Sequence, residues 1–204
     1  MRVRVPGAAG LIGSAVTDPC ARRLANPPAG GPVSGAAPSL ATRLVLGAVA
    51  GFVATLPMSI AMRKLHDRLP EEERYPAPPR ELIDSATADS VSEEPARDLT
   101  IAAHHLYGAA TGALVAAALP RAGIVTGAAA GVAVWTGSYL GWIPGIALLR
   151  PATDHPERRN GMMIAAHLVW GASTALAYRE LVRERDSLFS GGPDKDAAAV
   201  RSGK

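Results

Sequence analysis

Residues 44–62 read LVLGAVAGFVATLPMSIAM and contain no ionisable side chain. Arg43 and Arg63 flank the run, whose length is close to the about 20 apolar residues that a helix needs to cross a bilayer. A helix on the surface of a soluble protein would carry a polar face, and this run has none. We therefore interpret residues 44–62 as a membrane span.

Three further apolar runs extend this interpretation, at residues 99–119, 124–143 and 161–178. The run that begins at Ile124 stays apolar past its span, and the segment Gly141–Gly145 predicts a kink or an interfacial segment there. The sequence thus predicts an all-α polytopic membrane protein with four transmembrane helices. A soluble bundle of four buried helices is the disfavoured alternative, because none of the spans has a polar face.

The composition agrees with membrane helices. Hydrophobic residues make up 48% of the 204 residues but aromatic residues only 4%. The mean hydropathy is +0.13 although 19% of the residues are charged, so the charges must be segregated from the apolar runs. The one cysteine excludes an internal disulfide and a Cys-rich zinc site. A net charge of +3 is too mild to predict a nucleic-acid partner.

Polar segments flank and separate the spans. We expect residues 1–42, rich in Pro and Gly, to be disordered, residues 43–179 to form the transmembrane domain, and residues 180–204 to form a polar tail. Between the first two spans, the sequence PAPPR at residues 76–80 favours extended polyproline geometry over helix. Residues 82–94 favour a short surface helix.

The second and fourth spans resemble each other. IAAHHLYGAAT at residues 101–111 aligns with IAAHLVWGAST at residues 164–174, with seven of eleven positions identical. More weakly, GAVAG at 47–51 aligns with GAAAG at 127–131. Because two helices return the chain to its starting side, we predict two parallel two-helix repeats related by an axis along the membrane normal.

Glycine spacing in the spans favours close packing. A Gly-x-x-x-Gly pattern lets helix backbones approach each other. We expect these faces to pack helices within one chain, and a homo-oligomer through the same faces is the alternative. The pattern occurs at Gly47/Gly51, Gly108/Gly112, Gly127/Gly131 and Gly137/Gly141.

His104 and His167 are repeat-equivalent and lie within predicted spans. Ionisable residues inside a membrane are functional candidates by default. We predict that this pair faces the bundle axis, because lipid cannot satisfy an imidazole N–H. Structural hydrogen bonding, acid sensing or a proton relay, and a haem b or divalent metal site remain alternatives, and we predict no cofactor.

In a four-span topology all five histidines fall on one side of the membrane. Tyr107, Trp142 and Trp170 suit the aromatic belt at a membrane interface. Trp135 and Tyr139 lie deeper and should pack. The accessory candidates for a site around the histidine pair are His105, Tyr107, Trp170, His66 and His155.

Residues 1–16, MRVRVPGAAGLIGSAV, resemble the opening of short-chain dehydrogenase and epimerase domains. The resemblance implies a strand and a glycine-rich turn that cradles a pyrophosphate before a helix. Prolines at positions 19, 27 and 28 interrupt that helix, and no second strand with a ribose-binding acid precedes the first span. We expect no working nucleotide site.

Residues 44–179 resemble the YagU-like bacterial inner-membrane proteins. PAPPR at residues 76–80 and HLVW at residues 167–170 carry the resemblance. It implies a multi-pass protein of the bacterial inner membrane, and a link to acid tolerance without an established reaction.

The sequence predicts a non-enzymatic integral membrane protein, because no nucleophile–base constellation lies outside the spans. Its direct partner is the lipid bilayer, and its role is structural or stress-related, such as a response to mild acid. The alternatives are a small oligomeric transporter or channel, and a membrane redox protein that binds haem or metal through His104 and His167. An even number of spans places both termini on one face, and the basic residues favour the cytoplasmic face by a small margin.

Overall fold

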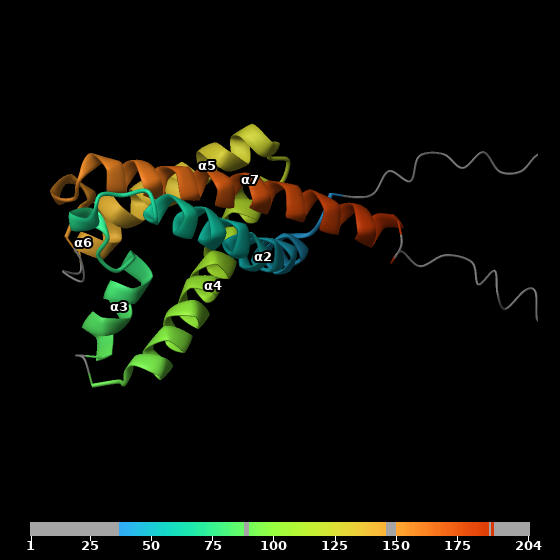
Figure 1. Cartoon of the computed structure of the whole chain (residues 1–204). Coiled ribbons are helices and arrows are strands. Elements are labelled where there is room, and N and C mark those ends of the chain that lie inside the picture. The colour runs from blue at the N-terminus through green and yellow to red at the C-terminus, as the bar shows by residue number, and fades with distance from the viewer. Residues whose placement is uncertain (1–36, 88–89, 146–149, 188, 190–204) are drawn as a thin grey trace, which may run out of the picture. The chain divides into compact units, whose positions relative to one another are not determined.

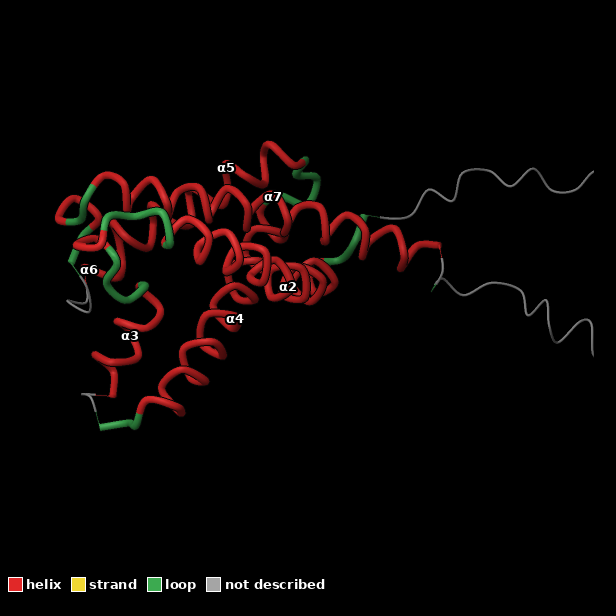
Figure 2. The backbone as a smooth tube through the Cα atoms, viewed as in Figure 1, coloured by secondary structure: helices red, strands yellow, loops and turns green. Residues whose placement is uncertain are grey.

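The computed structural model describes residues 37–87, 90–145, 150–187 and 189. Helix is the only regular structure in these ranges, which confirms the predicted all-α class (Figure 2). The long helices are α2 (Leu40–His66), α4 (Glu93–Ala118), α5 (Ile124–Gly137) and α7 (Glu157–Ser187). The shorter elements are η1 (Glu71–Glu73), α3 (Pro78–Thr87), the π-helical turn η2 (Ser138–Trp142), α6 (Ile143–Gly145) and η3 (Ala152–Asp154).

Several sequence predictions fall outside these ranges. The dinucleotide-like motif at residues 1–16 lies outside the described residues, as do most of the predicted disordered segment 1–42 and most of the tail 180–204. The first described helix begins within the former segment, at Leu40. The Ser39 hydroxyl caps it by accepting the Thr42 N–H at 3.2 Å.

Two segments are long and apolar enough to cross a membrane, by length and composition: Leu40–His66 and Ile124–Gly145. Within the described chain, α4 and α7 are long enough to cross a membrane, but neither contains a stretch that is both as apolar and as poor in charged residues. The structure therefore supports two candidate spans, and the arrangement with four spans stays a prediction.

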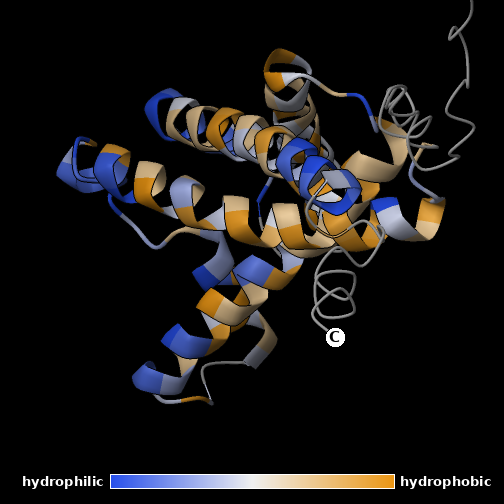
Figure 3. Ribbon diagram, turned by 90° about the vertical axis from the view of Figure 1, so that its right-hand side faces the viewer, coloured by the Kyte–Doolittle hydropathy of each residue, from blue (hydrophilic) through white to orange (hydrophobic). Residues whose placement is uncertain are grey.

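Side chains on α2 are distributed in the opposite way to those of a soluble helix. The buried positions hold small residues, among them Gly47, Ala50 and Gly51. Large apolar residues point outward and are 45–62% exposed, namely Val45, Val49, Phe52, Val53 and Leu56. Figure 3 shows hydrophilic residues gathered at the ends of the long helices and apolar residues along their middles. Along α2, the neighbouring helices are therefore held by close backbone approach more than by large side chains.

The long helices pack in the order α4, α2, α7, α5. Helix α2 packs along both α4 and α7, and α7 packs in turn along α5. Figure 1 shows α2 and α7 running in opposite directions. A two-fold axis that relates α2 to α5 and α4 to α7 would require α4 and α5 to pack together as α2 and α7 do. Within the described residues α4 and α5 make no comparable contact. The predicted repeat is therefore not shown, and it stays a prediction.

Gly51 is the point where three helices meet. A Cβ at this position would overlap the carbonyl oxygen of Gly108 on α4 and lie 2.8 Å from the Cα of Gly112. The Gly51 carbonyl oxygen accepts a hydrogen bond from the indole Nε1–H of Trp170 on α7, at 3.2 Å. It also accepts one from the Thr55 hydroxyl, at 2.9 Å. Glycine at position 51 thus lets α4 and α7 reach the same turn of α2.

A second close crossing joins α5 to α7. A Cβ at Gly131 would overlap the carbonyl oxygen of His167 and lie 3.1 Å from the Cα of Gly171. The two crossings tie each outer helix of the row to an inner one through backbone contact.

The predicted break after the third span is confirmed. Helix α5 passes into the π-helical turn η2, where Gly141 has non-helical dihedrals (φ −116°, ψ −105°). The short helix α6 follows and carries Pro144, a residue that interrupts helical hydrogen bonding.

The prediction of polyproline geometry at residues 76–80 is wrong, because Pro78 and Pro79 begin helix α3. Proline fits the first turn of a helix, where its missing N–H would have no partner in any case. The helix also starts earlier and ends earlier than the predicted segment 82–94. Arg80 links it to the start of α4, with its Nε at 2.7 Å from Asp84 Oδ1 and its Nη2 at 2.8 Å from Glu93 Oε2.

We expect Gly51→Ala to destabilise the helix packing by about 1–3 kcal/mol, the usual cost of overfilling a packed site. The added methyl group would meet backbone atoms of α4, which cannot rotate away as a side chain can. Gly137→Ala is the matched control, because a Cβ there meets no described atom within 4 Å and alanine favours helix. Circular dichroism during unfolding with a denaturing detergent measures the difference. Equal stability of the two variants would contradict the Gly51 crossing.

Candidate functional site

Both histidines of the predicted pair line one cavity of about 80 Å³. Its walls come from α2, α4, α7 and the segment that α5 and η2 form. Residues from outside the long helices complete it, namely Pro78, Pro79 and Leu82 of α3. Sequence reasoning predicted that the pair shares a site, and it did not predict the contribution of α3.

The Gly51 crossing explains why the two histidines enter the same cavity. His104 lies about one helical turn before Gly108, the residue of α4 that meets Gly51. His167 precedes Trp170 by three residues, and the Trp170 indole is bonded to the Gly51 carbonyl. Each histidine is therefore one turn away from the same point on α2.

The two imidazoles have different hydrogen-bond partners. His167 donates from Nδ1 to the carbonyl oxygen of Met163 at 2.8 Å, so a neutral His167 ring presents Nε2 as an acceptor. Nε2 of His104 is buried and has no hydrogen-bond partner within the described chain. A buried polar atom without a partner costs about 1–3 kcal/mol, and the cavity exceeds the about 10–15 Å³ that one water needs. The site thus suits water, or another small polar group, at His104.

Aromatic residues surround the cavity, and one of the belt assignments is wrong. Trp170 is 2% exposed and its N–H is bonded to Gly51, so it does not face outward as a belt residue would. Tyr107 is partly exposed, and its hydroxyl is hydrogen-bonded to that of Ser138 at 2.5 Å.

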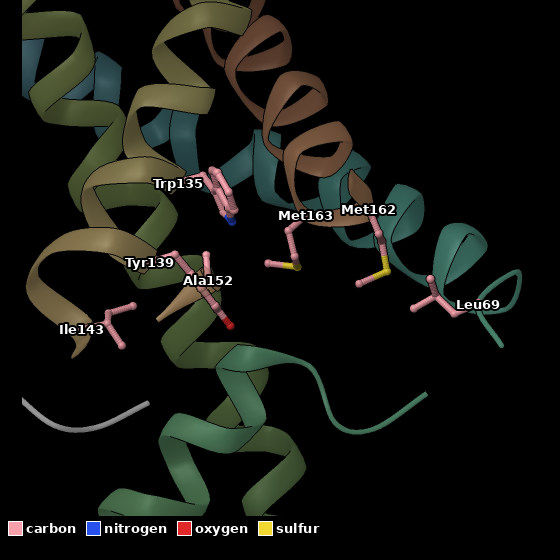
Figure 4. Close-up of a cluster of buried hydrophobic side chains, with 7 residues drawn as sticks. All are labelled: Leu69, Trp135, Tyr139, Ile143, Ala152, Met162 and Met163. Atoms are coloured by element: carbon pink, nitrogen blue, oxygen red, sulfur yellow. The ribbon is translucent and has the colours of Figure 1, made fainter. Parts of the chain in front are cut away.

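The deeper packing of Trp135 and Tyr139 is confirmed. Both are buried, and their stacked rings project toward Met163 (Figure 4).

The other accessory histidines lie outside the small cavity. His105 donates to the carbonyl oxygen of Ile101 at 3.0 Å, and its ring lies 5.1 Å from that of Phe52. His66 and His155 lie near Tyr75. His66 Nε2–H donates to the Tyr75 carbonyl oxygen at 3.3 Å, and His155 Nδ1 is 2.7 Å from the Tyr75 hydroxyl. Two of the five candidate histidines thus line the small cavity, and the other three do not.

Sequence analysis missed Arg159, which is only 2% exposed at the start of α7. Its guanidinium donates to the carbonyl oxygens of Tyr75, at 3.1 Å, and of Pro76. It lies 3.5 Å from the centre of the Tyr75 ring and 3.5 Å from Glu81 Oε1. One side chain thus binds the backbone and an aromatic face of the segment that leads into α3, and a carboxylate of α3 itself.

Arg159 consequently holds in place the residues that complete the cavity. Pro76 is bonded to Arg159, and Pro78 lines the cavity two residues later. A proline-rich segment has few N–H donors to pair with its own carbonyls, so it needs donors from elsewhere. The proline content of this segment was therefore the signal in the sequence that an outside donor is required. The sequence did not indicate which of the arginines near the spans would be that donor.

Burial shifts the pKa of two groups near Arg159 in the same direction. Burial raises the pKa of Glu81, and the neighbouring Arg159 cation opposes part of that rise. Burial also raises the pKa of Tyr75, again with Arg159 in opposition. At the start of α4, hydrogen bonds from Arg80 and Arg97 hold the pKa of Glu93 below its usual value.

The described residues contain no group of three or more His, Cys, Asp and Glu side chains arranged to hold a metal ion. The cavity shared by the histidine pair is also far below the about 300 Å³ at which sites for organic ligands begin. Its size therefore favours water over haem.

Comparison with protein-family models, with curated proteins and with solved structures found no match to this chain. The resemblance to the YagU-like proteins rests on its short motifs and stays a prediction.

We expect Arg159→Gln to destabilise the protein by about 1.5–3 kcal/mol, the usual contribution of hydrogen bonds made by a charged group. Segment 67–77 should then become sensitive to protease, because its carbonyls lose their donor. Arg158→Gln is the control, since Arg158 is exposed, and its effect should stay within about 0.5 kcal/mol. Limited proteolysis and detergent unfolding test both variants. Matching cleavage rates for the two would argue against the anchoring role.

Glu81 should make stability fall as pH rises. Its raised folded-state pKa means that the folded protein binds the proton more tightly than the unfolded chain does. The stabilisation is complete below the unfolded value of about 4.3 and is lost as pH rises through the folded pKa. Glu81→Gln, which mimics the protonated form, should flatten this dependence, and Glu94→Gln at an exposed site should not. Unfolding measured across this pH range would refute the assignment if Glu81→Gln kept the wild-type slope.

Proposed function

We propose that this protein is a non-enzymatic, four-span protein of the bacterial inner membrane whose histidine-lined cavity responds to mild acid. The observation that carries the proposal is the position of His104 and His167 on one cavity, with His104 Nε2 free of any described partner.

The exposed face of α2 supports the membrane location. Five large apolar residues point outward along one helix, and soluble monomers rarely expose contiguous apolar patches above a few hundred Å². Arg43 and Arg63 flank the apolar stretch, as expected where a helix leaves the hydrocarbon. A bilayer as the direct partner would remove these side chains from water.

The chemistry of imidazole supports the acid response. Histidine changes charge between about pH 5 and 8, and its protonated ring carries two donors and no acceptor. Two cations in a small cavity repel each other, so protonation of both rings would favour a wider, wetter cavity. The titratable groups that act on His104 are His105 on its own helix and His167 on α7. Helix α3 forms a wall of the cavity outside the four long helices, so we expect it to move.

A small transporter or channel is the second candidate. His104 also lines a larger cavity of about 510 Å³, so it stands at the boundary of two hollows. A proton or small solute passing between them would meet this side chain. The redox alternative has less support, because the shared cavity is small for a haem.

Nuclear magnetic resonance of ring-labelled histidines, in protein held in lipid nanodiscs, tests the proposal. We expect the His104 and His167 signals to titrate together in two steps as the pH is lowered. His104→Gln should reduce the His167 titration to one step, and the control His105→Gln should leave two. Independent titration of the two residues, or no titration of either, would overturn the acid response. Proton flux into proteoliposomes that His104→Gln abolishes would instead favour the transporter.

A further inference from the structure

The larger cavity beside His104 has the size of a ligand site. It holds about 510 Å³, within the about 300–1,000 Å³ range of small-molecule sites. It lies between the C-terminal end of α2, the segment that Arg159 holds, and the first half of α4. The proposed acid response uses only His104 of this cavity.

The lining of this cavity carries positive charge without a carboxylate. Two arginines, Arg63 and Arg74, line it together with the imidazoles of His66, His104 and His105. Arg63 is exposed and has no side-chain partner within the described residues. Arg74 donates from Nε to the Leu69 carbonyl and from Nη2 to the Asp67 carbonyl, which leaves Nη1 available. Arginine is the side chain best suited to bind phosphate through several parallel hydrogen bonds.

Helix capping explains only part of this charge. Arg63 and His66 lie in the last turn of α2, where cations favour the helix C-terminus. Arg74 belongs to another segment, and its side chain returns to the same cavity. A ligand anion is the simplest group that both arginines can share.

Apart from Ser59, Tyr75 and Thr100, the rest of the lining is apolar. Met62, Ile101 and Met162 contribute to it, and Ile101 is 59% exposed, so the apolar lining continues onto the outer surface of α4. The ligand that fits has an anionic head and an apolar tail. Arg63 directly follows the predicted span 44–62, which places the cavity where lipid headgroups would lie.

We propose that this cavity binds an anionic phospholipid, with its phosphate on Arg63 and Arg74 and its acyl chain along Met62, Ile101 and Met162. The inference rests on the membrane location in the proposed function. It adds a ligand class and a site that the acid response does not require.

Native mass spectrometry of the full-length protein, released from vesicles that contain phosphatidylglycerol and phosphatidylcholine with the same acyl chains, tests the site. We expect retained phosphatidylglycerol to exceed phosphatidylcholine. Arg63→Gln should lower that preference about fivefold, since a basic residue near lipid headgroups contributes about that factor, and Arg63→Gln/Arg74→Gln should abolish it. The single variant keeps the test valid if the loss of Arg74 disturbs the fold.

Lys64→Gln/Arg68→Gln is the matched control. It also removes two positive charges, but from exposed residues that lie beside the cavity and do not line it. Equal loss of phosphatidylglycerol in the control would reduce the effect to general surface charge and overturn the site. Displacement of the lipid by inorganic phosphate alone would overturn the lipid assignment. Histidine titration without any lipid preference would refute this inference alone, and lipid preference without histidine titration would refute the acid response alone.

Discussion

The missing side chain at Gly51 is the constraint on which the rest of the structure depends. Without a Cβ there, the backbone of α4 can lie against α2, and the Trp170 indole of α7 can reach the Gly51 carbonyl. Helices α4 and α7 therefore both contact the same turn of α2. Small residues face inward at this crossing and large apolar ones face outward, so van der Waals contact between backbones replaces a core of large side chains.

The same crossing sets the chemistry of the interior. It holds His104 and His167 one turn from a common point, so both line one cavity. Arg159 then fixes the proline-rich segment that leads into α3 and completes that cavity. Because His104 lines both hollows, a proton taken up at this residue and an anion bound beside Arg63 and Arg74 would attract each other. Acid response and lipid binding would therefore be coupled through one side chain.

Local features could be predicted from the sequence, and features that depend on tertiary contacts could not. The apolar run of α2, the break at Gly141 and the deep packing of Trp135 follow from residue type and spacing alone. The turn at Pro78 was misread, because a proline run fits either an extended segment or a helix start. Arg159 looked like any basic residue beside a span, since nothing local says which carbonyls it will bind. The histidine pair was expected to meet through a two-fold repeat, but the described contacts bring it together through α2 and α7.

Cross-linking in native membranes tests most directly whether the Gly51 crossing brings the histidines together. In a Cys20→Ser background, the variant His104→Cys/His167→Cys would be treated with a short bifunctional thiol reagent, beside a His105→Cys/His167→Cys control. We expect a cross-link in the first variant only, and we expect its loss when Gly51→Leu is added to a protein that still inserts. Equal cross-linking of both pairs, or labelling of both positions by a lipid-phase maleimide without any cross-link, would contradict it.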